Sequence, residues 1–214
     1  MLEKLAKQTA VYGISTIAVR FLSYLLTPVF TRVFEPEAYG IVTDVYALIP
    51  FALVVLTMGL ESAYFRFAAK ADAAAAAAGG TEGEIAAQAR AGKRRLFATA
   101  WGVTLLAASL FFLLTAFGRE RVAEWMGEAY VAHPEYVLLV AAVVWFDVAA
   151  CLPFSRLREQ GRAMTFVGIK ALGVVVNVAL AIGFALAGLY GTPFGVGWVF
   201  VANLIASAVT FNVI

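Results

Sequence analysis

Residues 165–189 read TFVGIKALGVVVNVALAIGFALAGL, a run of 25 residues in which Lys170 is the single charged side chain. At a rise of about 1.5 Å per residue, a helix of this length crosses the hydrocarbon core of a lipid bilayer. Strands of a membrane barrel would instead alternate in polarity and be about ten residues long. The stretch therefore predicts a transmembrane helix, because only helices and closed barrels satisfy their backbone hydrogen bonds within lipid.

Five further apolar runs accompany this one, and the composition of the whole chain agrees with them. The six predicted spans are 8–34, 41–67, 96–117, 136–154, 165–189 and 194–214, all within one domain, residues 1–214. Of the 214 residues, 63% are hydrophobic and 14% are charged, whereas about a quarter of an ordinary soluble domain is charged. The sequence predicts an all-α integral membrane bundle of six transmembrane helices and excludes a soluble globular protein.

Few of the residue types that build catalytic or metal sites occur in the chain. It has one cysteine, Cys151, and one histidine, His133, which excludes an internal disulfide and argues against a zinc site. No glycine-rich phosphate loop and no cluster of nucleophile and base is found. We therefore expect no enzyme, no cofactor and no metal, and the net charge of +2 gives no reason to expect nucleic acid.

The distribution of lysine and arginine predicts the orientation. With the N-terminus in the cytoplasm, eleven of the 16 basic residues lie on the inner side and three, Arg32, Arg119 and Arg121, lie on the outer side. The longest polar stretch, residues 68–95, is then a solvated inner loop with some helical tendency, and it contains a run of six alanines. Its basic end, Lys93 to Arg95, flanks the third span, where we expect it to touch anionic lipid headgroups.

The first span carries a polar stripe whose members recur every three or four residues: Gly13, Thr16, Arg20, Ser23, Thr27 and Thr31. Arg20 lies roughly 18 Å into the span, where a charge costs at least about 2.5 kcal/mol unless it meets water, an anion or a partner. We expect Arg20 to line a wet cavity and to contact the substrate. The alternative is a purely structural ion pair with Asp147 or Glu61.

Polar side chains also occur within four of the other spans, which predicts a hydrophilic interior for the bundle. The faces that carry them consist of Thr43, Pro50, Thr57, Glu61 and Tyr64 in the second span, Asp147, Cys151 and Ser155 in the fourth, Lys170, Gly173 and Asn177 in the fifth, and Asn203, Ser207 and Thr210 in the sixth. The expected substrate-binding residues are Arg20, Lys170, Arg66, Thr27 and Asn177, and the expected ion-coupling residues are Glu61, Asp147 and Asp44. As alternatives, Lys170 snorkels to the inner surface, and single Ser, Thr or Asn residues merely join helices by hydrogen bonds.

Two stretches of the chain carry a family resemblance. Residues 27–47, TPVFTRVFEPEAYGIVTDVYA, join the first two spans, and residues 59–67, GLESAYFRF, end the second. They resemble the polysaccharide-biosynthesis (Wzx-type) flippases of the multidrug, oligosaccharidyl-lipid and polysaccharide exporter superfamily. The resemblance implies a MATE-like transporter with two related helical lobes, of which these six spans form the N-terminal one. The chain stops within an apolar run at Ile214, so we expect it to be truncated at the C-terminus.

The resemblance also implies a cargo and a mechanism. The cargo is an undecaprenyl-diphosphate-linked oligosaccharide, the repeat unit of O-antigen, capsule or exopolysaccharide, which crosses the bacterial cytoplasmic membrane by alternating access. Arg20 corresponds to the cavity-lining cation of the first helix and Arg66 to the basic residue that ends the second. The implied partners are the lipid-linked oligosaccharide, membrane lipids, the C-terminal lobe and other polysaccharide-assembly proteins. The alternatives are a multidrug or small-cation exporter of the same superfamily and a non-transporting membrane scaffold for polysaccharide enzymes.

Overall fold

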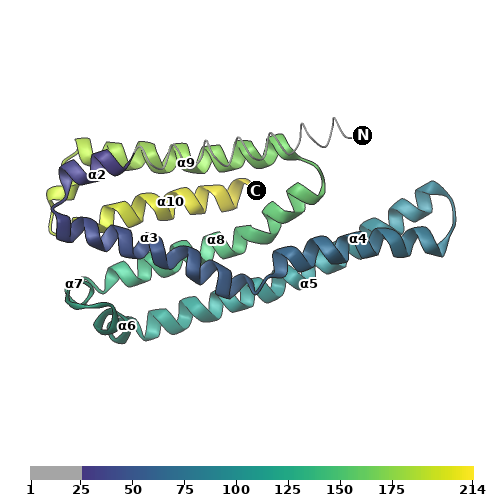
Figure 1. The fold of residues 1–214 in the computed structure, drawn as a ribbon, viewed down its shortest axis with the longest axis horizontal. Coiled ribbons are helices and arrows are strands. Elements are labelled where there is room, and N and C mark those ends of the chain that lie inside the picture. The colour runs from purple at the N-terminus through teal and green to yellow at the C-terminus, as the bar shows by residue number, and fades with distance from the viewer. Residues whose placement is uncertain (1–25) are drawn as a thin grey trace.

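The computed structural model describes residues 26–214, and all regular secondary structure within that range is helical (Figure 1). The elements are α2 (Thr27–Val33), α3 (Pro36–Thr57), α4 (Leu60–Ala78), α5 (Glu82–Phe117), α6 (Arg119–Met126), α7 (Glu128–Val131), α8 (Glu135–Glu159), α9 (Ala163–Leu186), the short 3₁₀ helix η1 (Leu189–Gly191) and α10 (Gly197–Val213). Arg20 and most of the first predicted span lie outside the described residues. The predicted all-α class is confirmed for the part of the chain that is described.

Within residues 26–214, four helical segments are long and apolar enough to cross a membrane. They are Pro36–Ala78, Glu82–Phe117, Glu135–Glu159 and Ala163–Leu186. Helix α10 is also apolar but is shorter, with 17 residues. Many large apolar side chains on these helices are exposed, as expected for a surface that contacts lipid. The chain is therefore a multi-pass membrane protein, while the count of six spans stays a prediction.

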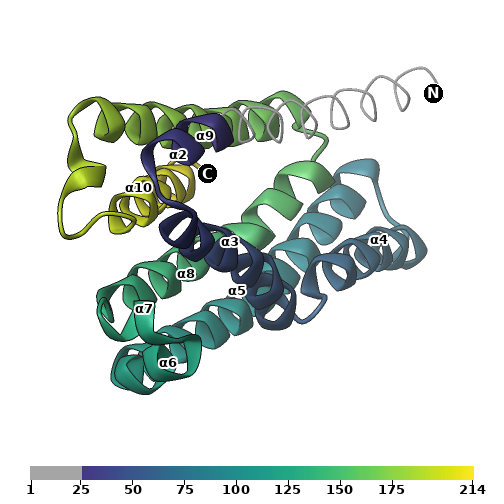
Figure 2. The same cartoon turned by 60° about the vertical axis from the view of Figure 1, so that its left-hand side comes forward.

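Helices α3 and α4 are separated by a sharp break. Met58 and Gly59 both adopt the left-handed conformation, with φ of 49° and 69°. Glycine adopts this conformation without the steric cost of a Cβ, whereas methionine does so rarely. The break changes the direction of the chain between the two helices (Figures 1 and 2). Side chains on α4 therefore do not continue the face that α3 presents.

The polar stretch that the sequence predicts as a solvated inner loop is a helical hairpin in the structure. Helix α4 continues to Ala78 and α5 begins at Glu82, so only a short turn joins them. Alanine has the highest helix propensity, which explains why α4 extends through the alanine run. A capping box starts α5, because the Thr81 N–H donates to Glu84 Oε2 at 2.8 Å and the Glu84 N–H donates to Thr81 Oγ1 at 3.4 Å. The hairpin projects beyond the other helices (Figure 1).

Helix α8 is the centre of the described bundle, with α3, α4, α5 and α10 packed around it. Six of its residues are at most 1% exposed: Val143, Val144, Val148, Ala149, Leu152 and Ser155. The Trp101 indole on α5 donates a hydrogen bond from Nε1 to the backbone oxygen of Ala149 at 2.9 Å. Burial of a large ring with its N–H satisfied stabilises the contact between α5 and α8.

An aromatic cluster joins α2 to the far end of α9. The ring centroids of Phe30 and Phe34 lie 6.1 Å and 4.9 Å from that of Tyr190 in η1. The Tyr190 hydroxyl donates to the backbone oxygen of Ala181 on α9 at 2.9 Å. These contacts hold the start of α3 opposite α9 and α10 (Figure 2).

Candidate functional site

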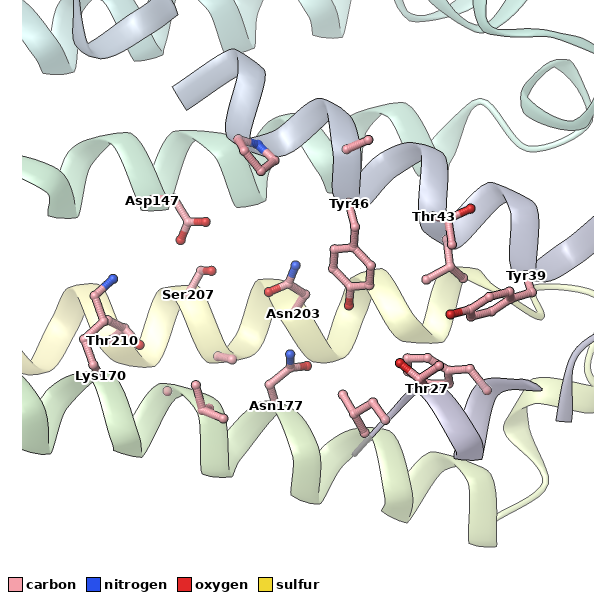
Figure 3. A pocket seen from close by; sticks show the side chains of 18 residues that line it. Thr27, Tyr39, Thr43, Tyr46, Asp147, Lys170, Asn177, Asn203, Ser207 and Thr210 are labelled. Carbon is pink, nitrogen blue, oxygen red and sulfur yellow. The ribbon is translucent and has the colours of Figure 1, made fainter. Parts of the chain in front are cut away.

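A polar pocket of about 850 Å³ lies between α3 on one side and α9 and α10 on the other (Figure 3). Its polar lining residues are Thr27, Tyr39, Thr43, Tyr46, Asp147, Lys170, Asn177, Asn203, Ser207 and Thr210. Sites for small molecules commonly enclose about 300–1,000 Å³. The pocket is therefore large enough for the head of a sizeable substrate.

Helical spacing explains why so many polar side chains meet here. On α9, Lys170 and Asn177 are seven residues apart and share one face, with the small residue Gly173 between them. The polar positions of α10 are three and four residues apart: Asn203, Ser207 and Thr210. Helices in a membrane turn such faces toward one another, because acyl chains offer no hydrogen-bond partners. The polar faces predicted for the fifth and sixth spans both line the pocket.

Two pairs of polar side chains face each other across the pocket. Ser207 on α10 lies opposite Asp147 on α8, and Tyr46 on α3 lies opposite Asn177 on α9. Figure 3 shows these four side chains pointing into the space between the helices. Asn203 and Thr43 offer further polar groups to a ligand.

Asp147 and Lys170 are the two charged residues in the lining. Asp147 lies halfway along α8 and is half-buried, and Lys170 is the eighth residue of α9. The Lys170 Nζ lies 4.2 Å from the ring centroid of Phe154, a cation–π contact, and is attracted to the Asp147 carboxylate. Charged side chains at membrane depth are costly and usually mark a substrate or ion pathway.

The structure brings four of the eight predicted site residues together in this pocket: Thr27, Asp147, Lys170 and Asn177. Arg20, the residue to which the sequence assigns the largest role, lies outside the described residues. Lys170 is exposed within the open pocket. Water in the pocket can therefore solvate its ammonium group without the side chain having to extend to the inner membrane surface.

Three predicted site residues lie away from the pocket. Glu61 faces α8, where it accepts a hydrogen bond from Ser155 Oγ at 2.7 Å and forms an ion pair with Arg158. Arg66 on α4 and Asp44 on α3 are exposed, and neither is part of the lining. The break at residues 58–59 explains the position of Glu61, because α4 does not continue the pocket face of α3.

Two lining residues, Tyr39 and Tyr46, were not predicted from the sequence. Together with Thr43 and Pro50 they occupy positions i, i+4, i+7 and i+11 of α3 and share one face. The signal was therefore present in the spacing. Tyrosine is amphipathic and is common both at lipid interfaces and in polar sites, so its residue type alone did not distinguish these positions.

Two tyrosines outside the spanning segments hold the helices that border the pocket. The Tyr130 hydroxyl donates to the backbone oxygen of Ile41 on α3 at 3.4 Å, and Tyr190 bonds Ala181 as described. Burial raises the pKa of Tyr130 to about 12, with a further contribution from the negative charge of Asp44. Burial also raises the pKa of Tyr190. Both phenols therefore stay protonated and keep donating at physiological pH.

Comparisons with known proteins identify one family. The model of the family described as "Polysaccharide biosynthesis protein" matches residues 5–214, a range that includes every helix described above and the whole pocket. No curated protein and no solved structure gives a significant match. In the described part of the chain, no group of three or more His, Cys, Asp or Glu side chains is placed to hold a metal ion. The match spans nearly the whole sequence, and the chain therefore belongs to the polysaccharide biosynthesis protein family.

Proposed function

We propose that the chain forms the N-terminal lobe of a flippase for an undecaprenyl-diphosphate-linked oligosaccharide, the repeat unit of O-antigen, capsule or exopolysaccharide. The observation that carries the proposal is the pocket, where a cation, a carboxylate, amides and hydroxyls meet between apolar helices. Membership of the polysaccharide biosynthesis family supports a transport role over an enzymatic one.

Each part of such a substrate has a chemical counterpart in or beside the pocket. Lys170 supplies positive charge for the diphosphate, since an ammonium group binds phosphate oxygens through charge-assisted hydrogen bonds. The hydroxyl of Thr27 and the amide of Asn177 suit the hydroxyls of the sugars. Arg20 on the first span would add a guanidinium to the same wall. Arg66, which lies outside the pocket, would attract the diphosphate at the inner surface before it enters.

Asp147 is the best-placed candidate for a coupling ion. Its carboxylate lines the pocket, lies opposite Ser207 and attracts the Lys170 ammonium group. Binding a proton or a sodium ion there would change the attraction between Asp147 and Lys170 and so the strength with which Lys170 holds an anion. Glu61 already has Arg158 as a partner, and Asp44 is exposed, so both are weaker candidates.

In this proposal the cycle is alternating access between two lobes. The N-terminus lies in the cytoplasm of a bacterial cell, and the hairpin of α4 and α5 lies on the same side, as the distribution of basic residues predicts. The C-terminal lobe supplies the second wall of the cavity, and the polyprenyl tail stays in the lipid between the lobes.

Binding to the purified chain in lipid nanodiscs tests the proposal. The ligand is a short-chain polyprenyl diphosphate that carries a sugar, and native mass spectrometry gives the dissociation constant. We expect Lys170→Gln to weaken binding about tenfold, the effect of losing one charge-assisted hydrogen bond. Arg121→Gln is the matched control, because it removes one exposed positive charge that lies outside the pocket and has no role in the proposal. Equal binding by the wild type and Lys170→Gln would remove Lys170 and the pocket from the proposal.

A multidrug or small-cation exporter of the same superfamily is the second candidate, and Asp147 in the pocket favours it. A cation would bind the carboxylate, and Lys170 would oppose that binding. Uptake of a fluorescent organic cation into vesicles that contain the protein separates the two functions. Uptake that Asp147→Asn abolishes would support the exporter and contradict the flippase.

A membrane scaffold for polysaccharide enzymes needs no charge within the bilayer. Neutralising Arg20, Asp147 and Lys170 together would leave polysaccharide production intact in cells if the chain were a scaffold. We expect production to be lost, with the protein still present in the membrane at its normal level.

A further inference from the structure

The basic end of the hairpin is divided between two faces of α5. Lys93 turns inward, and its Nζ lies 2.7 Å from Asp72 Oδ2 on α4 and 2.7 Å from Glu159 Oε1 on α8. Its charge is therefore compensated within the protein. This differs from the expectation that Lys93 acts together with its two arginine neighbours at the lipid headgroups.

The other face of α5 carries arginines that the described protein leaves uncompensated. A shallow surface hollow is lined by Arg90, Ala91, Arg94, Arg95 and Ala98, which lie close together on one side of the helix. Among residues 26–214, no carboxylate forms an ion pair with any of the three guanidinium groups. Like charges one turn apart repel each other. The three guanidinium groups therefore have no negatively charged partner among the described residues. Ala91 and Ala98 leave room for an anion to bind beside them.

The depth of these arginines follows from the apolar part of α5. Leu106 and Leu113 are 71% and 50% exposed and lie 11 and 18 residues after Arg95, which places them on the same side of the helix as Arg95. Residues 96–117 form about 33 Å of helix, close to the thickness of the hydrocarbon core. Arg95 therefore lies at the edge of the acyl chains, and Arg90, about 7 Å further along the axis, lies in the headgroup layer.

We propose that Arg90, Arg94 and Arg95, the arginine face of α5, bind the phosphate of an anionic phospholipid. A guanidinium group matches two phosphate oxygens at once, and this pairing is strongest where water is scarce. An anionic headgroup such as that of phosphatidylglycerol has no ammonium group to oppose the arginines, whereas zwitterionic headgroups have one. The bound lipid neutralises the arginine face and anchors the hairpin to the membrane surface.

Lipid retention by the full chain tests this site. The wild type, Arg94→Gln and the triple variant R90Q/R94Q/R95Q are purified, supplied with phosphatidylglycerol or phosphatidylcholine, and examined by native mass spectrometry. Each basic residue near an anionic surface changes affinity about fivefold. We therefore expect Arg94→Gln to weaken phosphatidylglycerol binding about fivefold and the triple variant to weaken it more than tenfold, with little change for phosphatidylcholine.

The chain offers a matched control, R32Q/R119Q/R121Q, which removes three arginines at the opposite ends of the spans. Elution as a single species and an unchanged melting temperature establish that each variant is folded. If the triple variant is not folded, Arg94→Gln alone tests the site. The proposal is overturned if the triple variant retains phosphatidylglycerol like the wild type, or if the control loses as much. It is also overturned if a polyprenyl diphosphate displaces phosphatidylglycerol from the arginine face. The site does not depend on transport, so Lys170→Gln should retain the lipid.

Discussion

Gly173 on α9 lies so close to Thr210 on α10 that a Cβ at position 173 would overlap the Thr210 Oγ1 atom. The absent side chain lets the two helices approach beside the pocket, as small residues do between helices in membranes. Both residues line the pocket, so their contact also sets the shape of its wall.

Replacing Gly173 by alanine should separate α9 from α10. Overpacking of a tight contact costs about 1–3 kcal/mol, and Thr210 has few rotamers with which to relieve it. We expect Gly173→Ala to lower the melting temperature of the purified protein. Gly168→Ala on the same helix is the control, because nothing lies within 4 Å of a Cβ there. Adding Thr210→Ala should restore stability, and a failure to do so would show that the contact is not the cause.

Lys93→Met should loosen the hairpin. It leaves the carboxylates of Asp72 and Glu159 without their shared ammonium partner, at a cost of about 1 kcal/mol for pairs that are partly exposed. Hydrogen exchange in α4 should rise, and thermal stability should fall slightly. Lys70→Met removes a lysine from the same hairpin that forms no ion pair with residues 26–214. Equal exchange in the two variants would show that the bridge does not hold the hairpin.

Asp147→Asn should uncouple transport from its driving ion while leaving substrate binding in place. Loss of one coupled charge removes about 2.3 kcal/mol of driving force per 100 mV, a factor of about fifty in the gradient that transport can sustain. Accumulation of oligosaccharide at the outer face of cells, measured with and without an ion gradient, checks this. Glu61→Gln changes a carboxylate outside the pocket and should keep its response to the gradient. A normal response in Asp147→Asn would exclude this residue as the coupling site.

The stability of the protein should fall at alkaline pH partly through Tyr130. Burial raises the folded-state pKa of Tyr130 to about 12, above its ordinary value of about 10. Folding therefore favours the neutral phenol, and this contribution is complete below pH 10 and lost as the pH rises from about 10 to 12. Melting temperatures of the wild type and Tyr130→Phe at pH 8 and pH 11 measure it. We expect the decrease between these pH values to be smaller in Tyr130→Phe, and identical decreases would contradict the assignment.

The helical class and the polar faces of α9 and α10 could be predicted because each depends on spacing along one helix. Lys170 and Asn177 are seven residues apart and must share a face wherever the helix lies. The packing of the helices decides which of their faces meet. The spacing of residues along one helix gives no information about that packing. The predicted acidic residues show this, because Asp147 lines the pocket whereas Glu61 faces Ser155 and Arg158.

The hairpin differs from its prediction for a different reason. A window of low hydropathy with several charges indicates solvent exposure, and exposure does not distinguish a loop from a helix. The capping pair Thr81 and Glu84 and the preceding alanine run were local signals for helices. The full length of α4 and α5, which extend beyond the apolar segments into the polar stretch, was visible only in the structure.

The left-handed pair at Met58 and Gly59 has a mechanical consequence. On one side of it, α3 forms a wall of the pocket, and on the other, α4 is fastened to α8 through Glu61 and to α5 through Asp72. The left-handed backbone at residues 58–59 interrupts the helix between these two parts. We therefore expect a change in the tilt of α3 to be absorbed at the break, while α4 keeps its contacts with α8 and α5.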